Sequence, residues 1–302
     1  MDVISVHWNA PNWLTSSIES LRQCTDIDAR FIVVDNSRSL STDELPEGVE
    51  LVTPSSNLGY AGGANFGLTH ALRTGSADYL AVAAHDAVVE KNTLARLVEA
   101  MESNPDVGVC GPGLKRPAVA GGIWNGRRAR FTPSTECSRV GVSDCDWLSG
   151  TLLLARRTAW IELDGFDERF GSYVEDVDLC LRASDLGWRV VVVPGATAAG
   201  QGSVSSAVTQ LVDINSALLA VKREGTAQFT AAILVYVFWF FRGLVASVHL
   251  GRPRWRRISS LRHACDHMVA ASKLLISPGR VLDFHRSGRH FPGSDPALRA
   301  HT

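Results

Sequence analysis

The sequence contains no pair of cysteines with C-x-x-C spacing, which argues against a zinc ribbon and against a dithiol redox pair. Its six cysteines are spread along the 302 residues, at Cys24, Cys110, Cys137, Cys145, Cys180 and Cys265. Several have apolar neighbours, and such thiols behave as small apolar core residues. Disulfides are rare in the cytosol, so we expect reduced core thiols in a cytosolic protein.

Other signals are absent as well. No basic segment precedes the first apolar residues, so we expect no signal peptide. The sequence has no internal repeat, no low-complexity tract and no G-x-G-x-x-G pattern, which argues against a dinucleotide-binding fingerprint. The longest uninterrupted apolar run, residues 231–241, has 11 residues. This is well short of the roughly 20 residues that span a bilayer.

Neither sign of charge is in excess over the whole chain, whose formal net charge is −1, but the charges are unevenly distributed. Residues 1–221 contain 17 Lys and Arg against 27 Asp and Glu, whereas residues 222–302 contain 13 against 4. The basic C-terminal part indicates an anionic partner, either a membrane or a nucleic acid. The length suits one large domain with a smaller appendage.

Short apolar segments alternate with helical patterns over residues 1–110. We expect strands at residues 3–6, 31–34, 51–52, 79–83 and 107–109, and helices at residues 14–24, 61–73 and 93–103. Strands that are apolar on both faces are typical of a parallel sheet covered by helices, and such sheets bind ligands at the carboxyl ends of their strands. Asp35 and Asp86 each follow an apolar strand, so both should lie at this edge.

The second half of the sequence is less regular. Residues 115–145 are rich in Gly, Arg, Pro and Ser, and we expect them to form an irregular excursion over the site. Further on, residues 151–155 form an apolar run, and we expect a helix that ends near Leu186, a strand at residues 190–193 that Pro194 ends, and a helix at residues 208–223.

Three segments combine residue types that suit a phosphorylated ligand. Asp35 is able to accept hydrogen bonds from a nucleoside or to cap its own turn. The glycine-rich segment 57–65 either allows backbone N–H groups to approach a phosphate or a sugar, or is simply a tight turn. Asp86 is a candidate ligand for Mg²⁺ or Mn²⁺, ions that commonly take one or two carboxylates together with substrate phosphates.

An acidic cluster opens the helix near residue 175. Glu175, Asp176 and Asp178 place three carboxylates within four residues of an otherwise apolar stretch. The helix dipole offsets part of their repulsion, by roughly 0.3–1 kcal/mol each. Burial and mutual repulsion should raise the pKa of at least one of them, which suits a general base. The alternative is a solvated helix N-terminus with capping carboxylates.

Taken in order, these motifs resemble the inverting family 2 glycosyltransferases of the GT-A fold, and they are most similar to the bacterial rhamnosyltransferase and galactofuranosyltransferase branch. The resemblance rests on residues 3–9, 33–37, 57–59, 63, 65, 86, 148–150, 165–170, 175–178, 182 and 187. It implies an α/β catalytic domain at residues 1–225, with a mixed, largely parallel sheet, and a helical appendage at residues 226–302. It also implies inverting sugar transfer from a dTDP- or UDP-sugar to a hydroxyl of a glycan or polyprenyl-linked acceptor in cell-envelope polysaccharide synthesis.

The resemblance implies roles for individual residues as well. Asp176 would be the catalytic base, and Asp86 would be the carboxylate that binds Mg²⁺ or Mn²⁺. The donor would be bound by Asn9, Asp35, Asn57, Gly59, Gly63, Asn65, His85 and Asp86. The acceptor would be bound by Trp147, Gly150, Glu175 and Asp178.

Two segments depart from the pattern of this branch, which usually has Asn-Pro-Asp at the metal strand and a histidine shortly after the last strand. Here the first segment reads Ala84-His85-Asp86, and residues 194–203 contain no histidine. Three alternatives follow. The cation is bound more weakly, His85 or Gln201 replaces the missing ligand, or the protein is a degenerate member.

Two other classes of protein are alternatives to an active transferase. A catalytically weak nucleotide-sugar-binding protein of the same fold fits the missing histidine but not the intact acidic cluster, and donor hydrolysis would separate the two. A sugar nucleotidyltransferase would need a basic, glycine-rich N-terminal loop for a triphosphate. Residues 1–30 contain Arg22 and Arg30 as their only Lys or Arg, and neither lies in such a loop.

The C-terminal part is expected to contact a membrane. Arg242 and Gly243 interrupt the apolar run, which resumes at residues 244–250, so a spanning helix of about 20 residues is one alternative. The arginines that follow flank Trp255 and are Arg252, Arg254, Arg256 and Arg257. Because aromatic and basic residues suit the headgroup layer, we predict a peripheral helix at the cytoplasmic face of the cell membrane and no nucleic-acid partner. A buried helix at a domain or subunit interface, and hence a homo-oligomer, is the other alternative.

Overall fold

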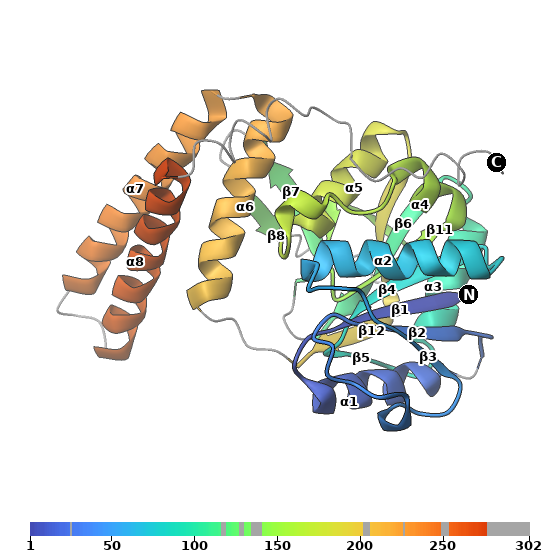
Figure 1. Ribbon diagram of the computed structural model, residues 1–302. Helices are drawn as coiled ribbons and strands as arrows, with labels where there is room; N and C mark the ends of the chain where they lie inside the picture. Colours follow the sequence, from blue (N-terminus) through green and yellow to red (C-terminus); the bar gives the residue numbers. More distant parts are fainter. Residues whose placement is uncertain are drawn as a thin grey trace. The chain divides into compact units, whose positions relative to one another are not determined.

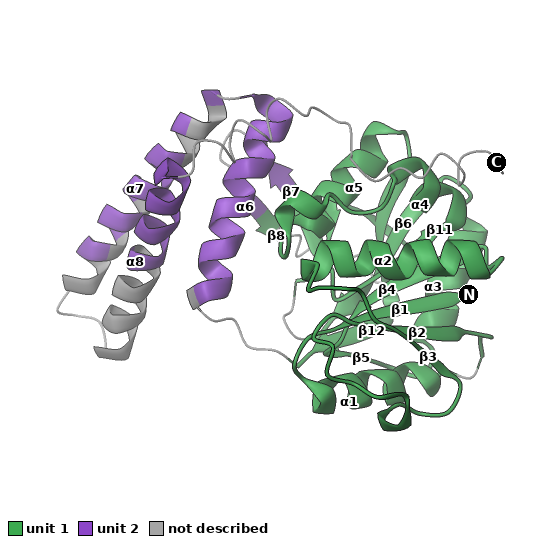
Figure 2. Ribbon diagram, in the orientation of Figure 1, with its two compact units in different colours: residues 1–123, 132–202, 292–302 green, residues 124–131, 203–291 purple. Residues whose placement is uncertain are grey.

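The computed structural model describes residues 1–24, 26–115, 119–126, 130–133, 141–201, 206–225, 227–248 and 254–276, and its elements are shown in Figure 1. Contacts divide the chain into two compact units (Figure 2). The first unit contains the described residues of 1–123 and 132–202, and the second contains those of 124–131 and 203–291.

The first unit is built on one mixed sheet. Its strands are β1 (Asp2–His7), β2 (Arg30–Asp35), β3 (Val49–Val52), β4 (Tyr79–Ala84), β5 (Ala87–Val89), β6 (Val107–Leu114), β9 (Ser143–Asp144), β11 (Leu152–Arg156) and β12 (Arg189–Gly200). They follow the order β3-β2-β1-β4-β11-β6-β12-β5, with β9 beside β12. β3, β2, β1 and β4 pair in parallel, as do β6 and β12, while β11 is antiparallel to both neighbours. The expected mixed, largely parallel sheet is confirmed.

Helices cover both faces of this sheet. They are α1 (Pro11–Arg22), α2 (Gly59–Thr74), α3 (Thr93–Ser103), α4 (Arg157–Leu163) and α5 (Glu175–Asp185). α1 and α3 pack on the same face, because Leu21, Leu94 and Leu97 share one buried cluster with Val3 and Ala81 of the strands. α2 packs on the opposite face and runs alongside β1 in the view of Figure 1. The strands are therefore held between helices on both faces of the sheet.

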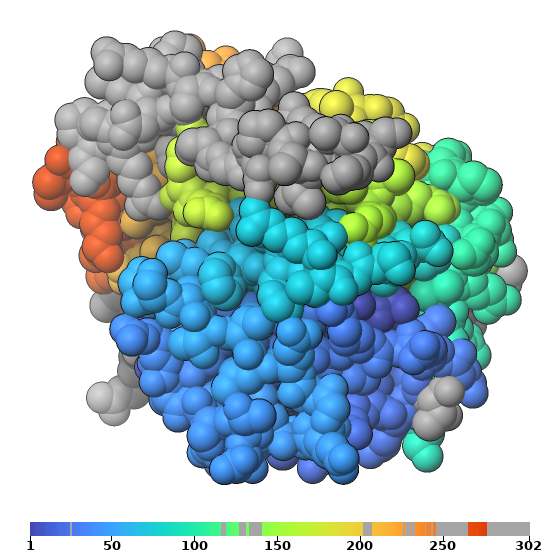
Figure 3. Space-filling model, turned by 45° about the vertical axis from the view of Figure 1, so that its right-hand side comes forward, coloured from blue at the N-terminus to red at the C-terminus, as the bar shows by residue number. Residues whose placement is uncertain are grey.

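Two glycines bring helix α2 unusually close to the sheet. A Cβ built on Gly67 would lie 2.5 Å from Ile4 Cγ2 and 2.7 Å from Val34 Cγ2, and one built on Gly63 would lie 2.8 Å from Val6 Cγ1. Neither methyl group would fit unless these buried side chains moved. Gly63 and Gly67 therefore set the depth of α2, which forms the cyan band on the outer surface in Figure 3. The same contacts set the position of the N-terminus of the helix.

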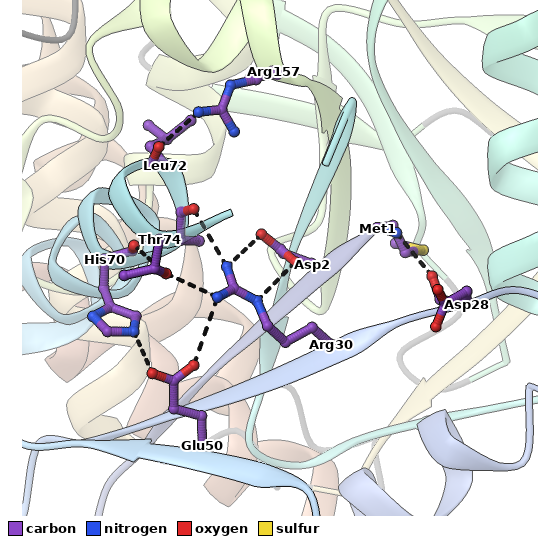
Figure 4. Close-up of polar contacts among 10 residues, drawn as sticks. Met1, Asp2, Asp28, Arg30, Glu50, His70, Leu72, Thr74 and Arg157 are labelled. Atoms are coloured by element: carbon purple, nitrogen blue, oxygen red, sulfur yellow. Dashed lines mark hydrogen bonds and ion pairs between the residues drawn. The ribbon is translucent and has the colours of Figure 1, made fainter. Parts of the chain in front are cut away.

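A polar network ties the other end of α2 to the start of β1 and β2 (Figure 4). Arg30 donates from Nε to Asp2 Oδ1 at 3.0 Å and from Nη2 to Asp2 Oδ2 at 2.7 Å. Its Nη1 donates to Thr74 Oγ1 at 2.8 Å, and Glu50 pairs with His70 at 2.6 Å. The hydrogen bonds to Asp2 raise the pKa of Arg30, so the cation persists throughout the physiological range. α2 is thus anchored at the end opposite its glycine-rich start.

The structure corrects two expectations about the second half of the sequence. The prediction that Pro194 ends the last strand was wrong, because β12 continues to Gly200. Its pairing with β6 shifts register between Val193 and Thr197, and such an irregularity is where a strand tolerates proline. Residues 115–145 were expected to be irregular, but they contain β7 (Gly121–Asn125), β8 (Arg130–Pro133) and β9. The short strand β10 (Trp147–Leu148) pairs with β7.

Three helices are described in the second unit, α6 (Ser206–Glu224), α7 (Ala227–Val248) and α8 (Arg254–Ile276). α6 packs on both of the others, so the boundary expected at residue 225 falls inside this unit. Tyr236 is buried among them, and its hydroxyl donates to the backbone oxygen of Asp213. His267 stacks on Tyr236 and pairs through Nδ1 with Asp213 Oδ2 at 2.6 Å. In the described parts of the chain, no helix has the length and apolar character needed to cross a bilayer.

Candidate active site

The carboxyl edge of the sheet gathers polar residues from three neighbouring strands. β1 ends at His7, β2 ends at Asp35, and the two residues are register partners. β4 ends at Ala84, and His85 and Asp86 follow it directly. The sequence-based expectation that Asp35 and Asp86 lie at the same edge is therefore met by the register of these parallel strands.

Asp35 organises the loop that follows it. Its Oδ1 accepts from the backbone N and the Oγ of Ser37 at 3.1 and 2.8 Å, and its Oδ2 accepts from the N–H groups of Ser39 and Leu40, each at 2.7 Å. Burial alone would raise the pKa of Asp35, but the hydrogen bonds from Leu40, Ser37 and Ser39 outweigh it and lower the pKa. An ionised carboxylate has about four acceptor positions, and four hydrogen bonds occupy them. Asp35 thus fixes loop 36–40 at the carboxyl edge.

A second loop, residues 57–59, is hydrogen-bonded to Asn36 of loop 36–40. Asn36 Nδ2 donates to the Gly59 oxygen at 2.8 Å and Asn36 Oδ1 accepts from Leu58 N at 2.9 Å, while Asn57 Oδ1 accepts from Gly59 N at 2.9 Å. Gly59 has a φ of +72°, and a Cβ there would lie 3.0 Å from the oxygen of Gly171. Only glycine suits this conformation and this close approach. The glycine-rich segment therefore brings the start of α2 against residue 171.

Asn65, which the sequence predicts to bind the donor, is bonded to the segment 166–168. Its Nδ2 donates to the Phe166 oxygen at 2.8 Å and to Glu168 Oε1 at 2.9 Å, and its Oδ1 accepts from Phe166 N at 2.8 Å. These bonds engage both ends of the amide with the segment that follows Gly165. Asn65 consequently joins α2 to the segment that leads into α5.

Two histidines and two tryptophans lie near the carboxyl ends of β1 and β4. His85 Nδ1 lies 3.2 Å from the Val6 oxygen and 3.3 Å from Trp8 N, and its ring stacks on Trp13 at 5.9 Å. His7 lies edge-on to His85 at 5.9 Å, is fully buried, and has no hydrogen-bond partner for either ring nitrogen among the described residues. Burial lowers the pKa of both rings, so both are neutral at pH 7. Asn9, at a φ of 47°, donates its N–H to Ser37 Oγ at 3.3 Å.

Asp86 stands next to the end of the last strand. β5 pairs with β12 through Ala87 and Gly200, and Gln201 N donates to the backbone oxygen of Asp86 at 3.2 Å. The long β12 is what brings Gln201 to this position. Among the described residues there is no group of three or more His, Cys, Asp or Glu side chains that could hold a metal ion. A cation at Asp86 would therefore need phosphate oxygens of the substrate to complete its ligands.

The acidic cluster begins after a strained turn. Tyr173 and Val174 have φ angles of 70° and 75°, a left-handed conformation that is unfavourable for a β-branched residue such as Val174. Backbone strain of this kind persists only where surrounding contacts enforce it, and it is common at functional sites. Here it turns the chain so that Glu175 and Asp176 open helix α5.

The three carboxylates of the cluster differ in their surroundings. Glu175 is buried, its Oε2 has no hydrogen-bond partner among the described residues, and burial together with Asp176 raises its pKa well above the usual range. Asp178, which the sequence predicts to contact the acceptor, is fully buried and pairs with Arg182 at 2.8 Å. Asp176 alone of the three is partly exposed.

Asp176 is held by two backbone N–H groups. Gly150 N donates to its Oδ2 at 2.7 Å, and Val177 N donates to its Oδ1 at 2.8 Å. Burial nevertheless raises its pKa, and the two hydrogen bonds offset only part of this effect. A Cβ on Gly150 would lie 3.1 Å from Asp176 Oδ2, so the contact depends on glycine. The expected raised pKa within the cluster is found at Glu175 and Asp176, and Trp147 is buried in β10 just before this turn.

Two residues of this region were missed by sequence reasoning. His7 carried a signal, since it is a polar residue at the end of an apolar strand beside Asp35. Tyr60 carried none, because its hydroxyl donates at 3.1 Å to the oxygen of Gly150, which is 90 residues away in the sequence. Burial, followed by the charges of Glu175, Asp176 and Asp86, raises the pKa of Tyr60 well above its usual range. The same group of charges shows that the fold brings Asp86 near the acidic cluster.

Comparisons with known proteins identify relatives and structural neighbours of the chain. An N-acetylglucosaminyl-diphospho-decaprenol L-rhamnosyltransferase of Mycobacterium tuberculosis (strain H37Rv) is 29% identical over 232 residues, which are 65% of this chain and 74% of that protein. Rhamnosyltransferase WbbL of Escherichia coli (strain K12) is 43% identical over 49 residues, 16% of this chain and 19% of that protein. Among solved structures, GalNAc-T7 with UDP, GalNAc and Mn²⁺ is 14% identical with a TM-score of 0.55, over 95% of this chain and 58% of that one.

The fold is that of a GT-A-type glycosyltransferase, as the sequence predicted. The model of the family named Glycosyl transferase family 2 matches residues 2–163, which is more than half of the chain. The protein therefore belongs to glycosyl transferase family 2.

Proposed function

We propose that the protein is an inverting transferase of the rhamnosyltransferase type, which moves a sugar from a dTDP- or UDP-sugar to a hydroxyl of a glycan or polyprenyl-linked acceptor in cell-envelope polysaccharide synthesis. The observation that carries the proposal is the environment of Asp176. Its carboxylate is the partly exposed one of the acidic cluster, and it is oriented by a hydrogen bond from Gly150 N. The name of the mycobacterial relative, an L-rhamnosyltransferase with a decaprenol-linked acceptor, supports the choice of sugar and acceptor.

In the proposed reaction, Asp176 takes the proton of the acceptor hydroxyl. The acceptor oxygen then forms its bond to the anomeric carbon of the donor, while the bond from that carbon to the diphosphate oxygen breaks. The nucleoside diphosphate leaves with the electron pair of that bond, and attack opposite to it inverts the configuration. The burial that raises the pKa of Asp176 makes the carboxylate a stronger base, which general-base catalysis requires.

For the donor, we propose a site along the carboxyl edge from β2 to β4. The base and ribose would lie against loop 36–40, which Asp35 holds, and beside Asn9. The diphosphate would approach the turn of Asn57 and Gly59, whose depth Gly63 sets, with Asn65 acting through the segment it fixes. The neutral His85 would contact the donor close to Asp86.

We further propose that Asp86 binds Mg²⁺ or Mn²⁺ together with the donor diphosphate. The donor set fits this view because one carboxylate with substrate phosphates is a common arrangement for such ions. When bound, the ion would neutralise charge on the leaving diphosphate. Gln201, whose N–H is bonded to the Asp86 backbone, and His85, whose Nδ1 faces the backbone of Val6 and Trp8 and whose Nε2 would be the ligand atom, are the two candidates to replace the missing histidine.

On the acceptor side, we propose that Gly150 and Glu175 border the acceptor hydroxyl, with Trp147 and Asp178 supporting them from the buried side. The raised pKa of Glu175 keeps it protonated to higher pH than an exposed glutamate. A protonated Glu175 would be able to donate a hydrogen bond to a sugar hydroxyl. Asp178 would contribute by fixing Arg182 and hence the backbone at Leu163 and Gly165.

A panel of nucleotide sugars tests the function. With Mn²⁺ present, we expect dTDP-rhamnose or a UDP-sugar to raise the melting temperature and to be slowly hydrolysed, and the same donor to support transfer to a polyprenyl-diphosphate-linked sugar. A donor at a hundredfold excess over its Kd stabilises by about 2.7 kcal/mol. Stabilisation with neither hydrolysis nor transfer would favour the catalytically weak binding protein. No stabilisation by any nucleotide sugar would contradict both.

We also propose that the second unit contacts an anionic membrane at its cytoplasmic face. Large apolar side chains are exposed along one face of α7, at Leu234, Phe238, Phe241 and Val245, which follow each other at intervals of three or four residues. Residues 222–302 are also strongly basic, with 13 Lys and Arg against 4 Asp and Glu. A helix with an apolar face beside basic residues is typical of binding in the headgroup region. The side chains of Arg252, Arg254, Arg256 and Arg257 lie outside the described ones.

Flotation with liposomes that contain anionic lipid tests this contact. We expect the wild type to float at low salt and less at high salt, because each basic residue near an anionic surface contributes about 1 kcal/mol. Changing the four arginines to Gln, or Phe238 and Val245 to Ser, should reduce flotation. Ile123→Ser is the matched control, since Ile123 is an exposed apolar residue of the first unit. A protein that ignores liposomes and forms dimers through α7 would show that the exposed face is a subunit interface.

A further inference from the structure

Gly150 is the point at which the proposed base meets the rest of the site. Its N–H donates to Asp176 Oδ2 at 2.7 Å, and its oxygen accepts from the hydroxyl of Tyr60 at 3.1 Å. Glycine has no side chain to restrict its backbone angles, so nothing intrinsic keeps this turn in one conformation. The hydroxyl of Tyr60 supplies a restraint on one side of the residue, and the carboxylate of Asp176 supplies one on the other.

Tyr60 is well suited to act as an anchor. Its own N–H donates to Ser172 Oγ at 3.2 Å, and the next residue, Ala61, donates its N–H to the Gly171 oxygen at 2.9 Å. Its ring meets that of Phe166 edge-on at 6.3 Å. Residues 171 and 172 lead directly into the strained pair that precedes Asp176 in the chain. Tyr60 therefore contacts both segments that determine where the Asp176 carboxylate lies.

We propose that Tyr60 is a positioning residue, whose hydroxyl fixes Gly150 so that the Gly150 N–H holds Asp176 in the orientation needed to deprotonate the acceptor. This inference rests on the proposed role of Asp176 as the base. The high pKa of Tyr60 keeps the hydroxyl protonated, and hence a donor to the Gly150 oxygen, over the working range of pH. The side chain of Tyr60 contacts Gly150 and Phe166, on the side of the proposed base.

Tyr60→Phe tests the inference because it removes the hydroxyl and retains the ring. We expect kcat to fall about tenfold, the scale of one hydrogen bond, while the KM for the donor stays unchanged. The acid limb of the pH–rate profile should move to higher pH, because a looser Gly150 N–H stabilises the ionised Asp176 less. Gly150→Ala should move the same limb in the same direction, since a Cβ would press on the carboxylate.

Tyr79→Phe is the matched control. Its hydroxyl donates to Glu102 at 2.7 Å and accepts from Arg156 at 3.2 Å at the opposite end of β4, so kcat and the pH profile should stay as in the wild type. The inference is overturned if Tyr60→Phe keeps both the wild-type kcat and the wild-type pH profile, or if both tyrosine variants lose activity equally. Asp176→Asn separates the two proposals, because its retention of activity would refute the base itself whatever Tyr60→Phe does.

Discussion

Replacing Asp176 with Asn is expected to lower the rate of sugar transfer by about 10²–10⁴, the usual cost of losing a general base. The amide keeps the size of the side chain, and its oxygen is still able to accept from Gly150 N. Its NH₂ group cannot accept from Val177 N, so the residue loses one of its two backbone contacts as well as its basicity. Initial rates with saturating donor and acceptor measure the effect.

Donor binding should survive this substitution, because the donor site we propose lies on the carboxyl edge around Asp86. Thermal stabilisation by the nucleotide sugar is therefore expected to match that of the wild type. Asp185→Asn is the matched control, an identical change at an exposed position in the last turn of the same helix. Near wild-type transfer by Asp176→Asn would remove this residue from the mechanism.

Replacing Asp86 with Ala is expected to weaken Mn²⁺-dependent donor binding by about 10² or more, since a cation on the diphosphate contributes several kcal/mol. Titration of the nucleotide sugar with Mn²⁺ and with EDTA measures the difference. Asp78→Ala changes the same residue type just before the start of β4, far from the carboxyl edge, and should behave as the wild type. If EDTA has no effect and Asp86→Ala is active, the metal proposal fails.

The same titration decides which residue replaces the missing histidine. Gln201→Ala should weaken Mn²⁺-dependent binding if Gln201 reaches the ion. His85→Ala should do so only if the ring reaches the ion through Nε2, since Nδ1 contacts the backbone of Val6 and Trp8. If both variants bind the donor as tightly as the wild type does in the presence of Mn²⁺, neither residue is a ligand, and Asp86 is the sole ligand of the three.

The sequence was sufficient for the fold because the strands of the first unit are short apolar runs with clear ends. It also located the carboxyl edge, since Asp35 and Asp86 follow their strands directly. Strand β12 was shortened in the prediction because proline normally ends a strand, and only the pairing with β6 shows how the bulge after Val193 absorbs it.

The contacts of individual site residues could not be predicted from the sequence, for a physical reason. The sequence indicates that Asp178 and Asn65 are polar and close to important motifs, but it does not indicate which partners satisfy them. Asp178 forms an ion pair with Arg182 on the next turn of the helix, and Asn65 forms hydrogen bonds with the backbone of Phe166. Tyr60 was invisible because its partner is brought to it only by the folding of two distant loops.

The close fit of α2 against the sheet limits which substitutions are able to stabilise this enzyme. Replacing glycine with alanine inside a helix is a standard route to heat resistance, worth roughly 0.5–1 kcal/mol. At Gly63 and Gly67 that route is closed, because the added methyl group would press on Val6 or on Ile4 and Val34. The helix would have to lift, and its first turn carries Tyr60 and the glycine-rich loop. A substitution inside the helix that is meant to stabilise the protein would thus lower its turnover rate, although the substituted residue touches none of the reacting atoms.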